Sequence, residues 1–68
     1  MKLSTRNQIK GEIVEILQDS VMAKVKIDIG NGTIITSTIT VEAVKELKLK
    51  KGDKVTALIK ASSVMIGK

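Results

Sequence analysis

Four kinds of residue are missing from this 68-residue chain: it has no cysteine, no histidine, no proline and no aromatic residue. Without cysteine there is no disulfide and no thiolate nucleophile, and without histidine there is no imidazole base. The usual ligands of zinc, haem iron and iron–sulfur clusters are missing for the same reason. We therefore expect a protein that is not an enzyme and has neither a metal site nor a cofactor. The lack of cysteine fits a reducing compartment.

Long hydrophobic runs are also missing. No run of apolar residues exceeds three, and the first eight residues lack the apolar stretch that a signal peptide carries. A membrane-spanning helix needs about 20 consecutive, mainly apolar residues. We therefore expect no leader, no membrane span or membrane partner, and a cytoplasmic location.

What remains is a globular balance of 43% hydrophobic and 28% charged residues. A chain of this length forms at most one small domain, so we expect a single domain over residues 1–68. Its core must consist of Val, Ile, Leu, Met and Ala alone, and so small a core stabilises a fold only weakly. Because neither disulfides nor metals can supplement that core, we expect the chain to be an oligomer.

The charge is unbalanced, since twelve Lys and Arg residues against seven Asp and Glu residues give a formal net charge of +5. Such a balance in a short chain favours an anionic partner. A nucleic acid, an acidic surface and a small oxyanion all satisfy that condition, and the net charge does not choose among them.

Three stretches in the first forty residues have the patterns of β-strands. Val21 to Ile29 alternates apolar and polar residues and ends at Gly30-Asn31-Gly32, a sequence that favours a hairpin turn. Thr33 to Thr40 is almost entirely β-branched, which indicates the second arm of that hairpin. Ile9 to Leu17 is a further strand. Its apolar phase slips near Ile13-Val14, where we expect a bend or bulge.

The pattern changes to that of a short helix after Thr40. Apolar residues recur at every third position from Val41 to Leu47, and the residues between them are mostly polar. Thr40 is a suitable N-cap, and Lys50-Lys51-Gly52-Asp53 is expected to end the helix.

The last part of the chain indicates two more strands, Val55 to Ile59, with Leu58 as an exception to the alternation, and Val64 to Ile66. Three strands, a short helix and two closing strands is the order of an OB-type barrel. We therefore predict an all-β fold with one short helix, a five-stranded Greek-key barrel of the OB type. An SH3-like barrel is the alternative, but that fold usually lacks a helix between its third and fourth strands.

Three further stretches are rich in hydrogen-bond donors and contain no acid: Ser4-Thr5-Arg6-Asn7, Thr36-Ser37-Thr38 and Lys60-Ala61-Ser62-Ser63. Each also has a purely structural explanation, as a solvated arm, a strand-forming segment and a turn. Ser37 is unusual because it falls in register with apolar Ile35 and Ile39, and a polar group on that face needs a partner. Because hydroxyl, amide and guanidinium groups donate to an anion that a carboxylate would repel, the three stretches together point to a compact anion.

The same stretches resemble a known family. Ser-Thr-Arg-Asn-Gln-Ile-Lys-Gly at 4–11, Ile-Thr-Ser-Thr-Ile at 35–39 and Ile-Lys-Ala-Ser-Ser-Val-Met-Ile at 59–66 are similar to the molbindins. These are single-domain members of the Mop family of molybdate- and tungstate-binding proteins, and the similarity runs over essentially the whole chain. The resemblance implies an OB-type subunit that assembles into a homohexamer, a trimer of dimers, with oxyanions bound at subunit interfaces.

The resemblance also implies which residues contact the ligand. Ala61 could contribute only its backbone N–H, because its side chain carries no donor. Relatives often have Ser at that position and an acid where this chain has Ser63. The implied molybdate contacts are Ser4, Arg6, Asn7, Thr36, Ser37, Lys60, Ala61 and Ser62.

Molybdate suits a site made of donors, because it is a tetrahedral dianion whose oxygens are all acceptors. A monoprotonated phosphate would leave its O–H unpaired there, at a cost of roughly 1–3 kcal/mol. We therefore expect intracellular binding and storage or buffering of molybdate or tungstate. A nucleic-acid-binding OB module is the main alternative and a purely structural oligomerisation module a lesser one. OB domains that bind single strands stack bases on aromatic side chains, which this chain lacks, so we expect no nucleic-acid partner.

Overall fold

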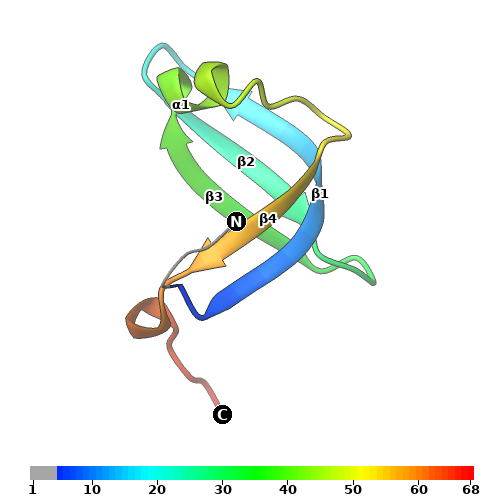
Figure 1. Ribbon diagram of the computed structural model, residues 1–68, viewed down its shortest axis with the longest axis vertical. Helices are drawn as coiled ribbons and strands as arrows, with labels where there is room; N and C mark the ends of the chain where they lie inside the picture. Colours follow the sequence, from blue (N-terminus) through cyan, green and yellow to red (C-terminus); the bar gives the residue numbers. More distant parts are fainter. Residues whose placement is uncertain (1–4) are drawn as a thin grey trace.

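The computed structural model describes residues 5–68, which form one curled antiparallel sheet with a short helix (Figure 1). The strand order across the sheet is β3-β2-β1-β4, so β3 and β4 are its edges. In Figure 1 α1 lies at one end of the sheet, and η1 and the C-terminus lie at the other. In chain order the elements are β1 (Asn7–Gln18), β2 (Met22–Asp28), β3 (Ile34–Thr40), α1 (Val41–Glu46), β4 (Lys54–Ile59) and the 3₁₀ helix η1 (Ala61–Ser63).

The long strand β1 curls because it pairs with a different strand at each end. Its first half pairs with β4 and its second half with β2, and the register shifts between Ile13 and Glu15. The predicted bulge is therefore confirmed. Gly11 lies at the change of partner, where a Cβ would stand 2.6 Å from the Cγ2 of Ile27 and 2.7 Å from the carbonyl oxygen of Asp28. Only a glycine lets the two strands approach this closely.

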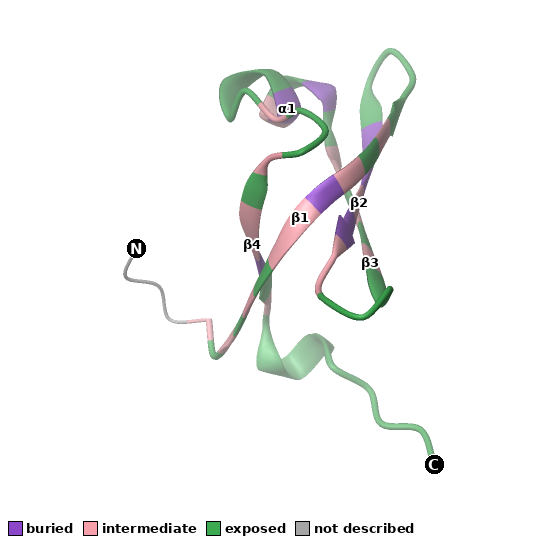
Figure 2. Cartoon of the chain, turned by 90° about the vertical axis from the view of Figure 1, so that its right-hand side faces the viewer, coloured by how far each residue is buried: buried purple, intermediate pink, exposed green. Residues whose placement is uncertain are grey.

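The core lies on the inner face of this curl and is entirely aliphatic, as expected. Ile13 is 1% exposed and is the largest fully buried side chain. Figure 2 shows the buried residues on β1, β2, β4 and α1. The buried residues of the described chain are Ile13, Ala23, Val25, Ile27, Val41, Val44 and Ala57.

The β2–β3 hairpin and the start of the helix confirm two local predictions. Gly30, Asn31 and Gly32 all have positive φ, and the N–H of Thr33 donates to the carbonyl oxygen of Gly30 at 3.0 Å, which closes the turn. The Oγ1 of Thr40 accepts a hydrogen bond from a backbone N–H of the first turn of α1 at 3.0 Å. Thr40 is therefore the N-cap.

The predicted end of the helix was wrong. The helix stops at Glu46, before the Lys50–Asp53 segment, and Lys48 takes the left-handed conformation with φ of 53°. The N–H of Leu49 then donates back to the carbonyl oxygen of Val44 at 3.0 Å, which closes the helix end. Glycine usually occupies this left-handed position at the end of a helix, but here the residue is Lys48. The sequence therefore carries no glycine that marks the end of α1.

The predicted fifth strand was also wrong, because β4 is the last strand in the part of the chain that the structure describes. After β4 the backbone turns through η1, and Val64, Met65 and Ile66 are 52%, 93% and 94% exposed. In Figure 2 this segment runs away from the sheet. A strand needs a neighbouring strand to complete its hydrogen bonds, and this segment has none among residues 5–68. The coarser prediction of a mainly β fold with one short helix holds.

Candidate functional site

Two of the three donor-rich stretches lie side by side, because the start of β1 pairs with the end of β4. Asn7 and Ile59 are the last residues opposite each other in this ladder. Arg6 precedes Asn7 and Lys60 follows Ile59, and both basic residues are exposed. The side-chain Nδ2 of Asn7 also donates to the carbonyl oxygen of Ile59 at 3.0 Å. Ser4, the remaining predicted residue of the first stretch, lies outside the described residues.

Lys60 caps the short helix η1, and two local hydrogen bonds close this turn. The N–H of Ser63 donates to the carbonyl oxygen of Lys60 at 2.8 Å, and that of Val64 donates to Ala61 at 3.2 Å. Among residues 5–68, no hydrogen bond uses the backbone N–H of Ala61 or of Ser62. Both residues are exposed, so these N–H groups can donate to a ligand.

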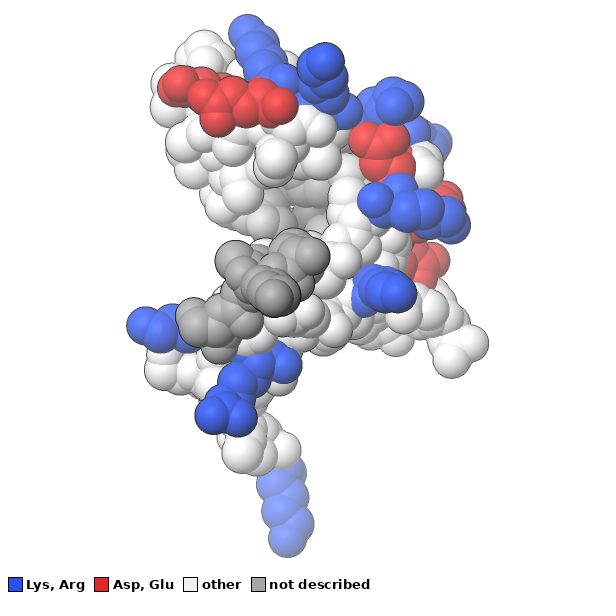
Figure 3. Space-filling model, in the orientation of Figure 1, with Lys and Arg blue, Asp and Glu red and all other residues white. Residues whose placement is uncertain are grey.

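This end of the molecule is electrostatically one-sided. Residues 1–11 and 54–68 contain no acidic residue, and Arg6 and Lys60 enter none of the ion pairs found among residues 5–68. On the face seen in Figure 3 the acidic side chains lie near α1 and along the right-hand side, while the part around η1 shows only basic and uncharged surface. We name the described donors at this end, Arg6, Asn7, Lys60, Ala61 and Ser62, the donor cluster.

Thr36 and Ser37 are not part of this cluster. They lie in β3, the opposite edge of the sheet from β4, and no strand pairing connects the two edges. Ser37 is half-buried between half-buried Ile35 and Ile39, which confirms that it lies on the inner face, whereas Thr36 is exposed. Within the described chain the hydroxyl of Ser37 makes no side-chain hydrogen bond.

The TOBE domain family matches residues 3–66 of the chain. The chain belongs to this family. It is 54% identical to the probable molybdenum-pterin-binding protein of Haemophilus influenzae, over 98% of this chain and 97% of that protein. The match to the full length of such proteins confirms the resemblance to the Mop family.

Solved structures give the same result for the fold of this TOBE domain. A molybdate-binding protein from Sporomusa ovata is 43% identical, with a TM-score of 0.93 and both chains covered completely. The cytoplasmic molybdate-binding protein ModG, in its molybdate-bound form, is 45% identical, with a TM-score of 0.90 over 96% of this chain and 46% of that chain. The curled sheet is therefore the fold of the Mop proteins.

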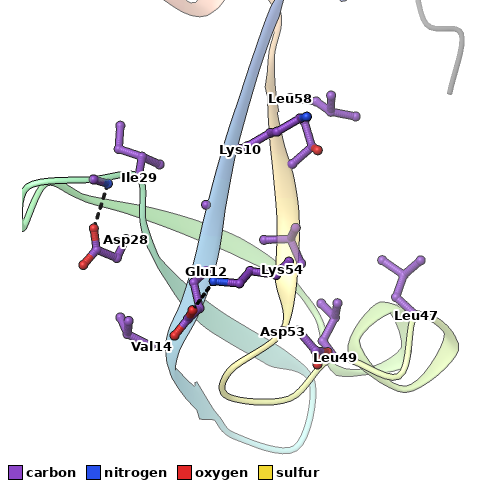
Figure 4. Close-up of a pocket in the computed structure, with 14 residues that line it drawn as sticks. Lys10, Glu12, Val14, Asp28, Ile29, Leu47, Leu49, Asp53, Lys54 and Leu58 are labelled. Carbon is purple, nitrogen blue, oxygen red and sulfur yellow. Dashed lines mark hydrogen bonds and ion pairs between the residues drawn. The ribbon is translucent and has the colours of Figure 1, made fainter.

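An open groove that was not predicted from the sequence lies beside β1 and β4. The groove of this TOBE domain measures about 1140 Å³, and its apolar lining includes Val14, Leu47 and Leu58 (Figure 4). Among its charged residues Lys54 pairs with Glu12 across the two strands and Asp53 pairs with Lys50, whereas Lys10 enters no ion pair among residues 5–68. Leu58 was the one signal of this groove, because it breaks the alternation of its strand. None of the predicted ligand contacts lines the groove.

Residues 5–68 contain no group of three or more Asp and Glu side chains that could hold a metal ion. None of the helices in that range is long and apolar enough to cross a membrane.

Proposed function

We propose that this protein binds molybdate or tungstate, and that its role is storage or buffering of these oxyanions in the cytoplasm rather than catalysis. One observation carries the proposal: Arg6 and Lys60, brought together by the β1–β4 ladder, lie at an end of the molecule whose sequence contains no acid. The names of the relatives in Haemophilus influenzae and Sporomusa ovata support it, since both are described as binding molybdenum compounds.

The chemistry of the donor cluster matches that of the ligand. A tetrahedral dianion needs positive charge and hydrogen-bond donors on all sides. Arg6 and Lys60 supply the charge, the unused N–H groups of Ala61 and Ser62 supply backbone donors, and the hydroxyl of Ser62 adds another. Ser4 contributes a further hydroxyl in this proposal, as the resemblance to the molbindins implies. The ligand is the only cofactor-like group that the proposal requires.

A single chain supplies only part of such a site, so we propose that the oxyanions bind between copies of the chain in a homohexamer. Thr36 and Ser37 lie on the other edge of the sheet and would reach an oxyanion held by the donor cluster of a neighbouring copy. The unpaired inner-face hydroxyl of Ser37 supports this arrangement, because a half-buried hydroxyl gains from a partner. The exposed tail at Val64–Ile66 supports assembly as well.

Thermal unfolding in the presence of different oxyanions tests the function. Molybdate and tungstate should raise the Tm at concentrations at which phosphate has no effect, because a ligand stabilises the state that binds it and only the fully deprotonated dianions satisfy a site of donors. Equal stabilisation by phosphate would contradict the proposal. Single-stranded DNA in a filter-binding assay is the control for the alternative nucleic-acid module, and it should not be retained.

A further inference from the structure

The side chain of Asn7 forms a hydrogen bond between residues 52 positions apart in the sequence. Its Nδ2 donates to the carbonyl oxygen of Ile59 at 3.0 Å, in a partly buried position. The two residues are also opposite each other in the β1–β4 ladder. Because the acceptor is a carbonyl, the amide must present its NH₂ group to Ile59, and the amide oxygen Oδ1 faces elsewhere.

This bond lies where the chain leaves the sheet. Ile59 is the last residue of β4, and Lys60 and η1 follow it. Among the described residues, the hydrogen bonds made by residues 60–68 are the two local ones that close η1. The Asn7 side chain is therefore the nearest side-chain link between the sheet and the segment that carries Lys60, Ala61 and Ser62.

We propose that Asn7 is a positioning residue, which holds the Lys60–Ser62 segment beside Arg6 in the protein without ligand. This inference rests on the proposed function and changes one part of it, since the resemblance to the molbindins implies that Asn7 contacts the ligand. The amide uses one of its two Nδ2 protons on Ile59, and its oxygen is an acceptor that offers an oxyanion nothing, so that only the second proton is left to reach a ligand. Fixing a binding group in advance increases affinity because less freedom is lost on binding.

The neighbours of Asn7 provide matched comparisons. Arg6 is exposed and makes no ion pair among residues 5–68, so its side chain is expected to act on the ligand directly. Gln8 makes the same kind of side-chain bond as Asn7, from Nε2 to the carbonyl oxygen of Thr5 at 3.0 Å, but this bond is local and exposed. Variants of these three adjacent residues can therefore distinguish a ligand contact at Arg6, a positioning contact at Asn7 and a local contact at Gln8.

The experiment measures two quantities for Asn7→Ala, Arg6→Ala and Gln8→Ala. The first is amide hydrogen exchange at Ser63, whose N–H donates to Lys60, without any oxyanion present. The second is the Kd for molybdate by isothermal titration. Asn7→Ala should speed exchange at Ser63 and raise the Kd by roughly 10–100-fold, by analogy with metal sites, where losing a group that orients a metal-binding side chain has an effect of this size. Saturating molybdate should restore part of the protection.

Arg6→Ala should raise the Kd and leave the exchange of Ser63 unchanged, and Gln8→Ala should change neither quantity. Asn7→Leu keeps roughly the size of the side chain and removes its donor without adding a charge, so it should reproduce Asn7→Ala if the alanine variant does not fold. A raised Kd with unchanged exchange would overturn the inference, because Asn7 would then be a ligand contact. Faster exchange with an unchanged Kd would overturn it as well. Failure of the wild-type protein to bind molybdate would instead contradict the proposed function, and the exchange data would still show whether Asn7 holds the segment.

Discussion

At the scale of single residues, charge decides which positions matter most for an oxyanion. A dianion at an interface needs cationic compensation, and Arg6 and Lys60 are the basic residues within the three donor-rich stretches. Arg6→Ala and Lys60→Ala should each weaken molybdate binding by about 2–5 kcal/mol, as when one partner of a buried charge pair is removed. Isothermal titration measures this loss for each variant.

The controls for this prediction are Lys45 and Lys48, which are exposed at α1, the other end of the sheet. Exposed charges are screened over roughly 8 Å at physiological ionic strength, so Lys45→Ala and Lys48→Ala should leave the affinity nearly unchanged. If these helix lysines proved as important as Arg6 and Lys60, the donor cluster would not be the binding site.

The structural role of a residue could be predicted from the sequence where that role depends only on its neighbours along the chain. Thr40 is the N-cap because a short hydroxyl can reach the N–H groups of the next turn, and that rule requires only the neighbouring sequence. Lys48 shows the limit of such rules. Its positive φ closes α1, but a lysine gives no sign of that conformation, whereas the nearby Gly52 does and was wrongly predicted to end the helix.

At the scale of elements, the turn between β1 and β2 makes part of the stability depend on pH. The Oδ1 of Asp19 accepts hydrogen bonds from the N–H groups of Met22, at 2.8 Å, and Val21, at 2.7 Å. These two bonds, Met22 first, lower the pKa of the Asp19 carboxyl below its ordinary value. A lowered pKa contributes stability that is present above the ordinary carboxyl pKa and is lost as the pH falls through the lowered one.

Replacing Asp19 should therefore reduce the pH dependence of the free energy of unfolding in the acidic range. Asp19→Asn should be less stable than the wild type at neutral pH, and the difference should shrink as the pH falls through the acidic range in which Asp19 titrates. Urea unfolding at a fixed protein concentration measures this at each pH. Glu46→Gln, which removes an exposed carboxylate from α1, is the control and should keep the pH dependence of the wild type. A constant difference between Asp19→Asn and the wild type would show that the charge of Asp19 has no part in the turn.

The strands that the sequence predicted correctly are those that find a partner within the chain. In β2 and β3 the alternation matched the inner and outer faces, because each strand lies beside a neighbour. Val64–Ile66 is a run of three apolar residues and forms no strand, since η1 directs it away from both edges of the sheet. Alternation indicates which side chains of a strand can share a face, but it does not indicate which strand will pair with it, because pairing depends on the tertiary structure. For the same reason the pairing of Asn7 with Ile59 could not be predicted from the sequence.

At the scale of the whole molecule, the described chain leaves unusual surfaces uncovered for so small a protein. Both edges of the sheet lack a pairing strand among the described residues, and the tail exposes Val64, Met65 and Ile66. Exposed strand edges and apolar side chains favour association with another copy. The aliphatic core contains seven buried residues among those described, which makes the added burial in an oligomer important for stability.

The tail variants test this assembly. Burying Ile66 against a neighbouring copy would contribute about 1.5–3 kcal/mol, so Ile66→Asp should shift the protein from the proposed hexamer to smaller species at micromolar concentration and lower its Tm. Native mass spectrometry and sedimentation velocity give the distribution of species. Lys68→Asp places the same acid in the same exposed tail without removing an apolar group, and it should assemble as the wild type does.

If Ile66→Asp also formed the wild-type oligomer, the tail would lie outside the interface. A stably folded wild-type monomer would contradict the assembly itself, because Ser37 and the donor cluster would then have no second copy through which to meet.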